Sequence, residues 1–143
     1  MYFDAAYIAK CYLNEPGAER VRDRARQASG LCSADFGRLE FTCIVQRHRR
    51  EGRLIAREAR QVFQEFEEDE QNAVWRWLPV STDLVRETCE RVRRLPSPTL
   101  IRTGDALHLA CARAFGFKEV YTNDRRMLAG ASHFGLTGVN LLE

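Results

Sequence analysis

The stretch TGDALHLACARAFGFKEVYTND, residues 103–124, contains the helix signal and the strand signal that decide the fold class. Residues 103–115 are almost wholly apolar after Asp105, as in a buried helix, and Gly116 is a typical helix stop. Residues 119–122 then form a short run typical of a buried strand. A helix followed closely by a buried strand predicts an α/β domain.

The same alternation extends through the rest of the chain. Further strands are predicted at 2–3, 31–32, 75–80 and 138–142, and further helices at 5–13, 18–28, 34–50, 54–72 and 84–95. We therefore expect one domain over residues 1–143, with a parallel sheet covered by helices on both faces. Trp75 and Trp77 flank Arg76, and we expect their rings on opposite sides of the strand.

Composition limits the class of protein, but it does not indicate what the protein binds. The chain has 143 residues, is 45% hydrophobic and carries a formal net charge of +2, so overall charge does not indicate a binding partner. Its five cysteines lack Cys-x-x-Cys spacing, which favours free thiols in a reducing compartment. No signal peptide or membrane-spanning run is evident. We expect a cytoplasmic protein that does not enter the membrane.

Four acidic residues stand where an α/β domain places ligands. Asp4 ends the first strand and Asp124 follows the strand at 119–122, whereas Asp105 and Glu40 lie on helices that begin at the same edge. Ligands bind outside the carboxyl ends of parallel strands. Four converging carboxylates would repel each other unless a hard divalent cation, Mg²⁺ or Mn²⁺, lay between them.

Three of these acids also have an ordinary structural interpretation. Asp4 could simply cap a helix, Asp124 could form a turn before Arg125, and Glu40 could belong to a solvated helix face. The joint pattern favours a metal site. Such a cation can polarise a phosphodiester oxygen and generate hydroxide from water near neutral pH.

Four segments together resemble the PIN-domain family, and more narrowly the VapC-type toxins of toxin–antitoxin pairs. They are residues 2–6 with 13–17, residues 39–42 with Arg47 and 50–52, residues 104–110, and residues 121–128. The resemblance implies a three-layer α/β/α sandwich around a short parallel sheet, and an endoribonuclease that depends on Mg²⁺ or Mn²⁺. It also implies a homodimer, an RNA substrate and a cognate antitoxin protein. The metal-binding and catalytic quartet carries over to Asp4, Glu40, Asp105 and Asp124.

One position departs from the family pattern. Many members have Ser or Thr two residues after the first acid, where this chain has Ala6. A hydroxyl that could support the metal ligands is therefore missing. This leaves open a second function class, a PIN-like module that binds RNA or protein without cutting.

Several other residues are candidates for substrate contact. Arg47 and Arg125 could neutralise RNA phosphates, although Arg47 could equally be part of a basic helix end. Thr122 and Asn123 could contact substrate or orient water and carboxylate beside Asp124. For His108 we prefer a buried position supporting the acids to a role as general acid.

A phosphoaspartate receiver domain also carries acids at strand ends. It needs an acidic pair after its first strand and an Asp at the end of its third strand. Here Asp4 is followed by Ala5 and Ala6, and residues 77–80 contain no acid. These spacings disfavour a receiver domain.

Overall fold

Tyr2 and Phe3 join two short β-ladders into one parallel middle layer. In the computed structural model, which describes residues 1–143, the ladders pair β1 (Leu31–Ala34) with β2 (Trp75–Leu78) and β3 (Glu119–Tyr121) with β4 (Thr137–Val139). Tyr2 forms a parallel bridge with Cys32, and Phe3 forms one with Tyr121. The N–H of Phe3 donates to the Cys32 carbonyl at 2.9 Å, and the N–H of Tyr121 donates to the Tyr2 carbonyl at 2.9 Å. The N-terminal segment therefore lies between β1 and β3.

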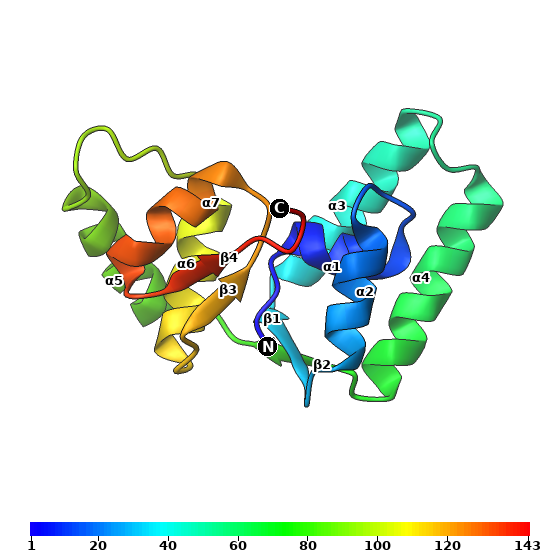
Figure 1. Ribbon diagram of the computed structural model, residues 1–143, viewed down its shortest axis with the longest axis horizontal. Coiled ribbons are helices and arrows are strands. Elements are labelled where there is room, and N and C mark those ends of the chain that lie inside the picture. Colours follow the sequence, from blue (N-terminus) through cyan, green and yellow to red (C-terminus); the bar gives the residue numbers. More distant parts are fainter.

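Helices cover both faces of this layer. They are α1 (Ala5–Tyr12), α2 (Ala18–Arg26), α3 (Gly37–Arg50), α4 (Ala56–Gln71), α5 (Thr82–Arg93), α6 (Thr103–Ala114) and α7 (Arg125–Gly130), followed by a 3₁₀ turn, η1 (Ala131–Phe134). Figure 1 shows α1 to α4 on one side of the strands and α5 to α7 on the other. The predicted α/β/α sandwich is confirmed.

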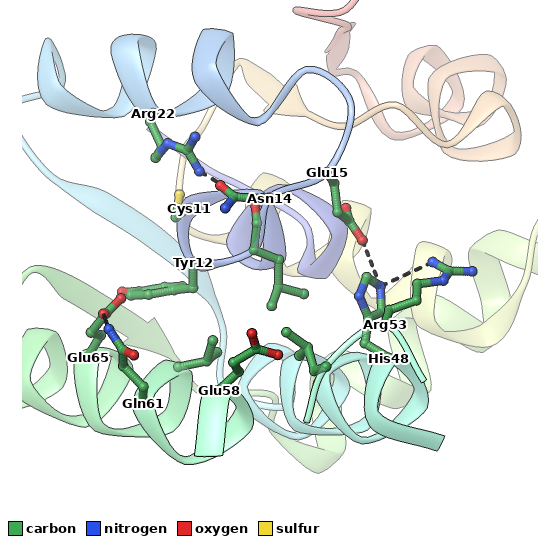
Figure 2. A pocket seen from close by; sticks show the side chains of 13 residues that line it. Cys11, Tyr12, Asn14, Glu15, Arg22, His48, Arg53, Glu58, Gln61 and Glu65 are labelled. Carbon is green, nitrogen blue, oxygen red and sulfur yellow. Dashed lines mark hydrogen bonds and ion pairs between the residues drawn. The ribbon is translucent and has the colours of Figure 1, made fainter. Parts of the chain in front are cut away.

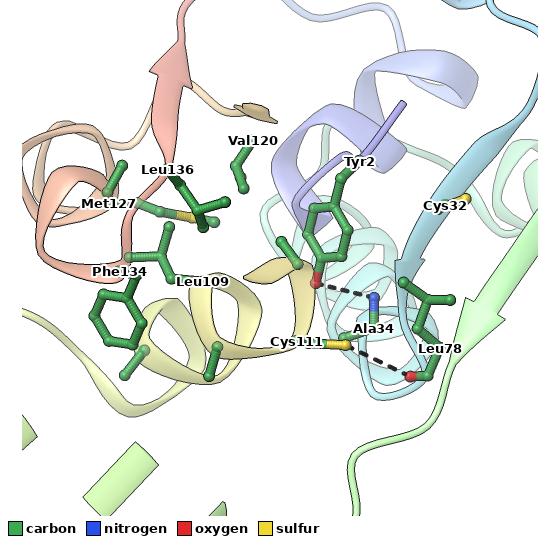
Figure 3. Packing of buried hydrophobic residues seen from close by; sticks show 14 of the residues in the cluster. Tyr2, Cys32, Ala34, Leu78, Leu109, Cys111, Val120, Met127, Phe134 and Leu136 are labelled. Carbon is green, nitrogen blue, oxygen red and sulfur yellow. Dashed lines mark hydrogen bonds between the residues drawn. The ribbon is translucent and has the colours of Figure 1, made fainter. Parts of the chain in front are cut away.

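Alternating side chains divide the hydrophobic core between the two helical layers. Tyr2 and Val120 belong to a buried cluster built largely from α6, α7 and η1 (Figure 3). Phe3 and Tyr121 belong to a second cluster, which contains Phe41 of α3 and residues of α1 and α4. Successive residues of a strand point to opposite faces, so a two-residue segment contributes to both cores.

The two tryptophans correct one expectation. Trp75 and Trp77 do not lie on opposite sides of β2, because their rings stack with centroids 5.6 Å apart and an interplanar angle of 16°. Residues two apart on a strand share a face, which is the physical reason the expectation was wrong. Both rings belong to the core layer of α1, α3 and α4, with Trp75 buried.

The last strand is shorter than predicted. The predicted strand at 138–142 appears as β4, which ends at Val139. Beyond it, the Tyr7 hydroxyl accepts the N–H of Leu141 at 2.8 Å and donates to the Asn140 side chain at 3.2 Å. The chain therefore leaves the sheet to bond with α1.

The cysteines and the helices bear on the expectations from composition. All five cysteines are free thiols, with Cys32 and Cys111 buried. None of the helices combines the length and the apolar character needed to cross a bilayer.

Candidate metal centre

Asp4 and Asp124 both cap the helix that follows their strand. Asp4 accepts the N–H of Tyr7 at 2.9 Å at the start of α1. Asp124 accepts the N–H groups of Arg126 at 2.7 Å and Met127 at 3.2 Å at the start of α7. A carboxylate is favoured at this position because it satisfies free helix N–H groups and meets the positive end of the helix dipole. The capping role and a place at the candidate site are therefore compatible.

Thr122 links these two acids through one oxygen. Its hydroxyl donates to the Asp4 carboxylate, and the same oxygen accepts the N–H of Asp124 at 2.9 Å. Thr122 has no exposed surface, and Asp4 is 5% exposed. The buried hydroxyl thus holds the ends of the N-terminal segment and of β3 in a common arrangement.

Glu40 reaches from the first turn of α3 to the first turn of α6. Its Oε2 lies 2.7 Å from Nε2 of His108, a residue of α6 that is 2% exposed. Its Oε1 lies so near Gly104 that a Cβ added there would be 2.8 Å away. The Glu40 carboxylate therefore lies against the same helix turn that carries Asp105.

Asp105 is half-buried in that turn and accepts the N–H of Arg102 at 3.3 Å. Burial raises the pKa of its carboxyl, and the negative charge of Asp124 raises it further. The Arg102 contacts and His108 act in the opposite direction. The influence of Asp124 means that the acids of α6 and of the β3–α7 turn lie within electrostatic reach of each other.

The pKa of the buried Asp4 carboxyl is also raised. Burial raises the pKa of its carboxyl to about 6, against the hydrogen bonds from Thr122 and Tyr7, which lower it. Repulsion from Glu40 raises this pKa, and the nearby His108 lowers it. Asp4 therefore interacts electrostatically with the α3 acid as well as with the α6 histidine.

The four acids have almost no basic counter-ion. Among the ion pairs of the chain, only the contact between Glu40 and His108 involves one of them, and no Lys or Arg pairs with any of the four. The side-chain oxygen of Asn123, next to Asp124, is buried and has no hydrogen-bond partner. A region with surplus carboxylate charge and a free oxygen acceptor fits a hard divalent cation by its donor chemistry.

The acids are nevertheless not gathered into a preformed cage. No group of three or more His, Cys, Asp or Glu side chains is placed so that it could hold a metal ion. The acids instead form linked pairs, with Thr122 between Asp4 and Asp124, and with Glu40 against the α6 turn of Asp105.

The predicted substrate residues fall into different environments. Thr122 is fully buried with its hydroxyl engaged inside the protein, and Asn123 is half-buried beside it. Arg125 is exposed next to Asp124. Arg47 is exposed in the last turn of α3, at the opposite end of that helix from Glu40. The structure thus brings Thr122, Asn123 and Arg125 to the acids but not Arg47.

A surface hollow of about 600 Å³ lies away from the acids, between the α1–α2 turn, the end of α3 and α4 (Figure 2). At its wall, Glu15 bonds to His48 at 2.9 Å and to Lys10 at 3.1 Å. Lys10 and His48 are each 5% exposed, so this ion cluster joins α1 to α3 inside the protein. None of the four acids lines this hollow.

Sequence reasoning missed Tyr2 and Gly104 as parts of the site. Tyr2 appeared only as an apolar strand residue, yet its hydroxyl lies 2.9 Å from Nδ1 of His108. No local pattern distinguishes such a tyrosine from an ordinary core aromatic. The buried position expected for His108, beside the acids, is confirmed.

Comparison with known proteins points to one family. The sequence profile of the PIN domain family matches residues 1–131. The structure is similar to that of VapC20 from Mycobacterium tuberculosis, described as a toxin that cleaves the sarcin-ricin loop, with a TM-score of 0.69. The two chains are 17% identical, and the match covers 90% of this chain and 93% of VapC20, so the likeness is one of fold. No curated protein matches the sequence.

Proposed function

Because the chain belongs to the PIN domain family, we propose that it is a metal-dependent endoribonuclease and the toxin of a toxin–antitoxin pair. The observation that carries the proposal is that four acids without a Lys or Arg partner lie in electrostatically linked pairs at the carboxyl edge of the sheet: Asp4 with Glu40, and Asp105 with Asp124. Such a grouping is costly in a folded protein unless a cation or a proton neutralises it.

In this proposal the four acids hold Mg²⁺ or Mn²⁺. When bound, the cation would polarise a phosphodiester oxygen and activate a water molecule. The protein's own part is to keep the carboxylates in place. The N–H of Tyr7 and the hydroxyl of Thr122 orient Asp4, and the first turn of α7 orients Asp124.

RNA is the proposed substrate, and Arg125 is the basic residue best placed to contact it. Its exposed guanidinium follows Asp124 directly, where it could bind a phosphate next to the scissile bond. The half-buried Asn123 is a second candidate for substrate contact. Since the similar protein VapC20 is described as cleaving the sarcin-ricin loop, an RNA that contains this loop is the first substrate to test.

Family membership also underlies the proposed partners, a second copy of the chain and a protein antitoxin, in the cytoplasm. Val85 and Val92, which are 41% and 37% exposed on α5, support a contact between copies because burying them removes apolar surface from water. Light scattering on the protein and on a Val85→Glu, Val92→Glu double variant measures this. A monomeric wild-type protein would contradict the dimer.

The nuclease is tested by incubating the purified protein with total cellular RNA in Mg²⁺, in Mn²⁺ and in EDTA, beside the Asp105→Asn variant. Discrete fragments that require the cation and disappear in the variant are expected. Equal cutting in EDTA, or by Asp105→Asn, would contradict the proposal. The melting temperature of the wild-type protein should rise with Mn²⁺, because a ligand of the folded state stabilises it.

A binding module that does not cut is the second candidate. The observation in its favour is Ala6, the second residue of α1, which provides no hydroxyl two residues after Asp4. Metal-independent retention of RNA without cleavage would favour this alternative. An Ala6→Ser variant that gains cleavage would show what the missing hydroxyl contributes.

A further inference from the structure

A buried chain of hydrogen bonds runs from β1 to the Glu40 carboxylate. The N–H of Ala34 donates to the Tyr2 hydroxyl at 3.1 Å (Figure 3). That hydroxyl lies 2.9 Å from Nδ1 of His108, and Nε2 of His108 lies 2.7 Å from Oε2 of Glu40. Tyr2 is 0% exposed and His108 is 2% exposed, so the chain is shielded from water until it reaches Glu40.

With a neutral imidazole, one set of hydrogen-bond directions satisfies every group of this chain. A backbone N–H can only donate, so the Tyr2 oxygen accepts from Ala34 and its own proton is free to bond to Nδ1 of His108. An imidazole whose Nδ1 accepts carries its proton on Nε2. The Nε2–H of His108 then points at the carboxylate of Glu40, which can only accept.

Packing holds the imidazole in this orientation. The ring of Phe36 lies 4.6 Å from that of His108, and the ring of Tyr2 meets it edge to face at 5.9 Å and 82°. On a further side, a Cβ added at Gly37 would be 3.5 Å from Cε1 of His108. A ring enclosed on these sides loses little further freedom when Glu40 bonds to it.

Gly104 gives Glu40 room to reach the ring. A side chain at this position would place its Cβ 2.8 Å from Oε1 of Glu40, closer than ordinary contacts allow. One carboxylate oxygen of Glu40 therefore bonds to His108, and the other lies over Gly104, where no side chain stands in its way. His108 and Gly104 both belong to α6, which also carries Asp105.

We propose that His108 is a positioning residue, whose Nδ1 is held by the Tyr2 hydroxyl and whose Nε2–H holds the Glu40 carboxylate against the first turn of α6, beside Asp105. This inference rests on the proposed function, because it explains how one acid of the quartet is presented. Hydrogen-bond partners behind metal ligands fix ligand orientation, and their loss typically weakens metal binding about 10–100-fold.

Mn²⁺ binding to the full-length protein, measured by calorimetry without RNA, is the first test. His108→Leu removes the donor, whereas His108→Gln retains an amide N–H at a similar distance along the side chain. His108→Leu is expected to weaken Mn²⁺ binding by about 10–100-fold, and His108→Gln to retain most of the affinity. Equal affinity of wild type and His108→Leu would overturn the proposal.

Heteronuclear NMR of the imidazole nitrogens is a second test that does not depend on a folded His108→Leu variant. In the wild-type protein Nε2 of His108 should carry the proton and Nδ1 should not. In Tyr2→Phe, Nδ1 loses its hydrogen-bond partner, so its nitrogen signal should shift while Nε2, which faces Glu40, stays protonated. A protonated Nδ1 in the wild-type protein would overturn the proposal.

These measurements separate the inference from the proposed function. Mn²⁺ binding that depends on His108, in a protein that leaves RNA intact, would support the inference and contradict the nuclease. RNA cleavage with the same Mn²⁺ dependence in wild type and His108→Leu would support the nuclease and contradict the inference. A folded wild-type protein that binds no Mn²⁺ would contradict both.

Discussion

The hydroxyl of Thr122 donates a hydrogen bond to the carboxylate of Asp4, a residue 118 positions away in the sequence. The same oxygen accepts the N–H of Asp124 at 2.9 Å. One buried atom therefore relates the positions of two of the four candidate ligands. The placement of Asp4 and Asp124 is coupled, and a change at Thr122 should affect both.

Thr122→Val should weaken both the fold and the cation site. The substitution keeps the shape of the side chain but leaves the N–H of Asp124 and the buried Asp4 carboxylate without this partner. Leaving such groups unpaired costs about 1–3 kcal/mol of unfolding free energy. Urea denaturation and Mn²⁺ calorimetry measure the two effects. Thr122→Ser keeps the hydroxyl and is the matched control, so equal losses in Ser and Val would contradict the role of the hydroxyl.

The stability of the metal-free protein should depend on pH through Asp4. Burial raises the pKa of this carboxyl in the folded protein to about 6, above its ordinary value of 3.8. Folding therefore favours the protonated acid. The contribution of Asp4 to the free energy of unfolding is fully present below 3.8, the pKa in the unfolded protein. It is lost as the pH rises through about 6, the pKa in the folded protein. The difference between the two pKa values corresponds to about 3 kcal/mol.

Asp4→Asn removes this titration and isolates its effect from that of other acids. In EDTA, the unfolding free energy of the wild type should fall relative to that of Asp4→Asn between about pH 4 and about pH 7. Urea denaturation across this range checks the trend. Parallel curves for the two proteins would contradict the raised pKa. At neutral pH, Mn²⁺ should stabilise the wild type more than the variant.

Gly104→Ala should separate stability from cation binding. Alanine favours a helix over glycine by up to about 1 kcal/mol, and the position lies in the first turn of α6. The added Cβ would meet Oε1 of Glu40 at 2.8 Å, and a flexible carboxylate can move away. We expect unchanged or higher thermal stability together with weaker Mn²⁺ binding. The exposed neighbour Thr103→Ala is the control, and it should leave Mn²⁺ affinity unaltered.

Gly17→Ala should loosen the docking of the C-terminal residues. Gly17 has a φ of +79°, and an added Cβ would lie 2.2 Å from Cδ2 of Leu142. Gly52 has a similar φ of +72° but no atom within 4 Å of such a Cβ. Gly52→Ala therefore measures the backbone strain alone, about 1–2 kcal/mol. Gly17→Ala should cost more, and a second change, Leu142→Ala, should relieve the excess. Equal losses at the two glycines would contradict a Leu142 contact.

Much of the fold followed from local patterns in the sequence. The apolar run of residues 103–115 and its stop at Gly116 predicted α6 closely, because helix periodicity and caps act over neighbouring residues. The acids at strand ends were identifiable for the same reason. Asp4 and Asp124 are helix caps as well as candidate ligands, and an aspartate at that position serves both roles.

Contacts between segments that are distant in the sequence were predicted less well. Arg47 shares α3 with Glu40 but lies in the last turn of the helix, away from the acids. Asn140 and Leu141 bond to the Tyr7 hydroxyl instead of extending the predicted strand, a contact that no local pattern indicates. Trp75 and Trp77 were misplaced for a different reason, since the two-residue period of a strand already puts them on one face.

Residue periodicity, helix caps and acids at strand ends thus specified the elements of this protein, because each depends on interactions between residues close in sequence. Which atoms meet at the candidate site depended on the order and register of the strands. The parallel bridges of Tyr2 and Phe3 bring Asp4 to Thr122 across 118 positions, and the packing of α6 brings His108 to Glu40 across 68. Hydrogen bonds act over about 3 Å, so such partners are established only once the sheet and its helices have assembled.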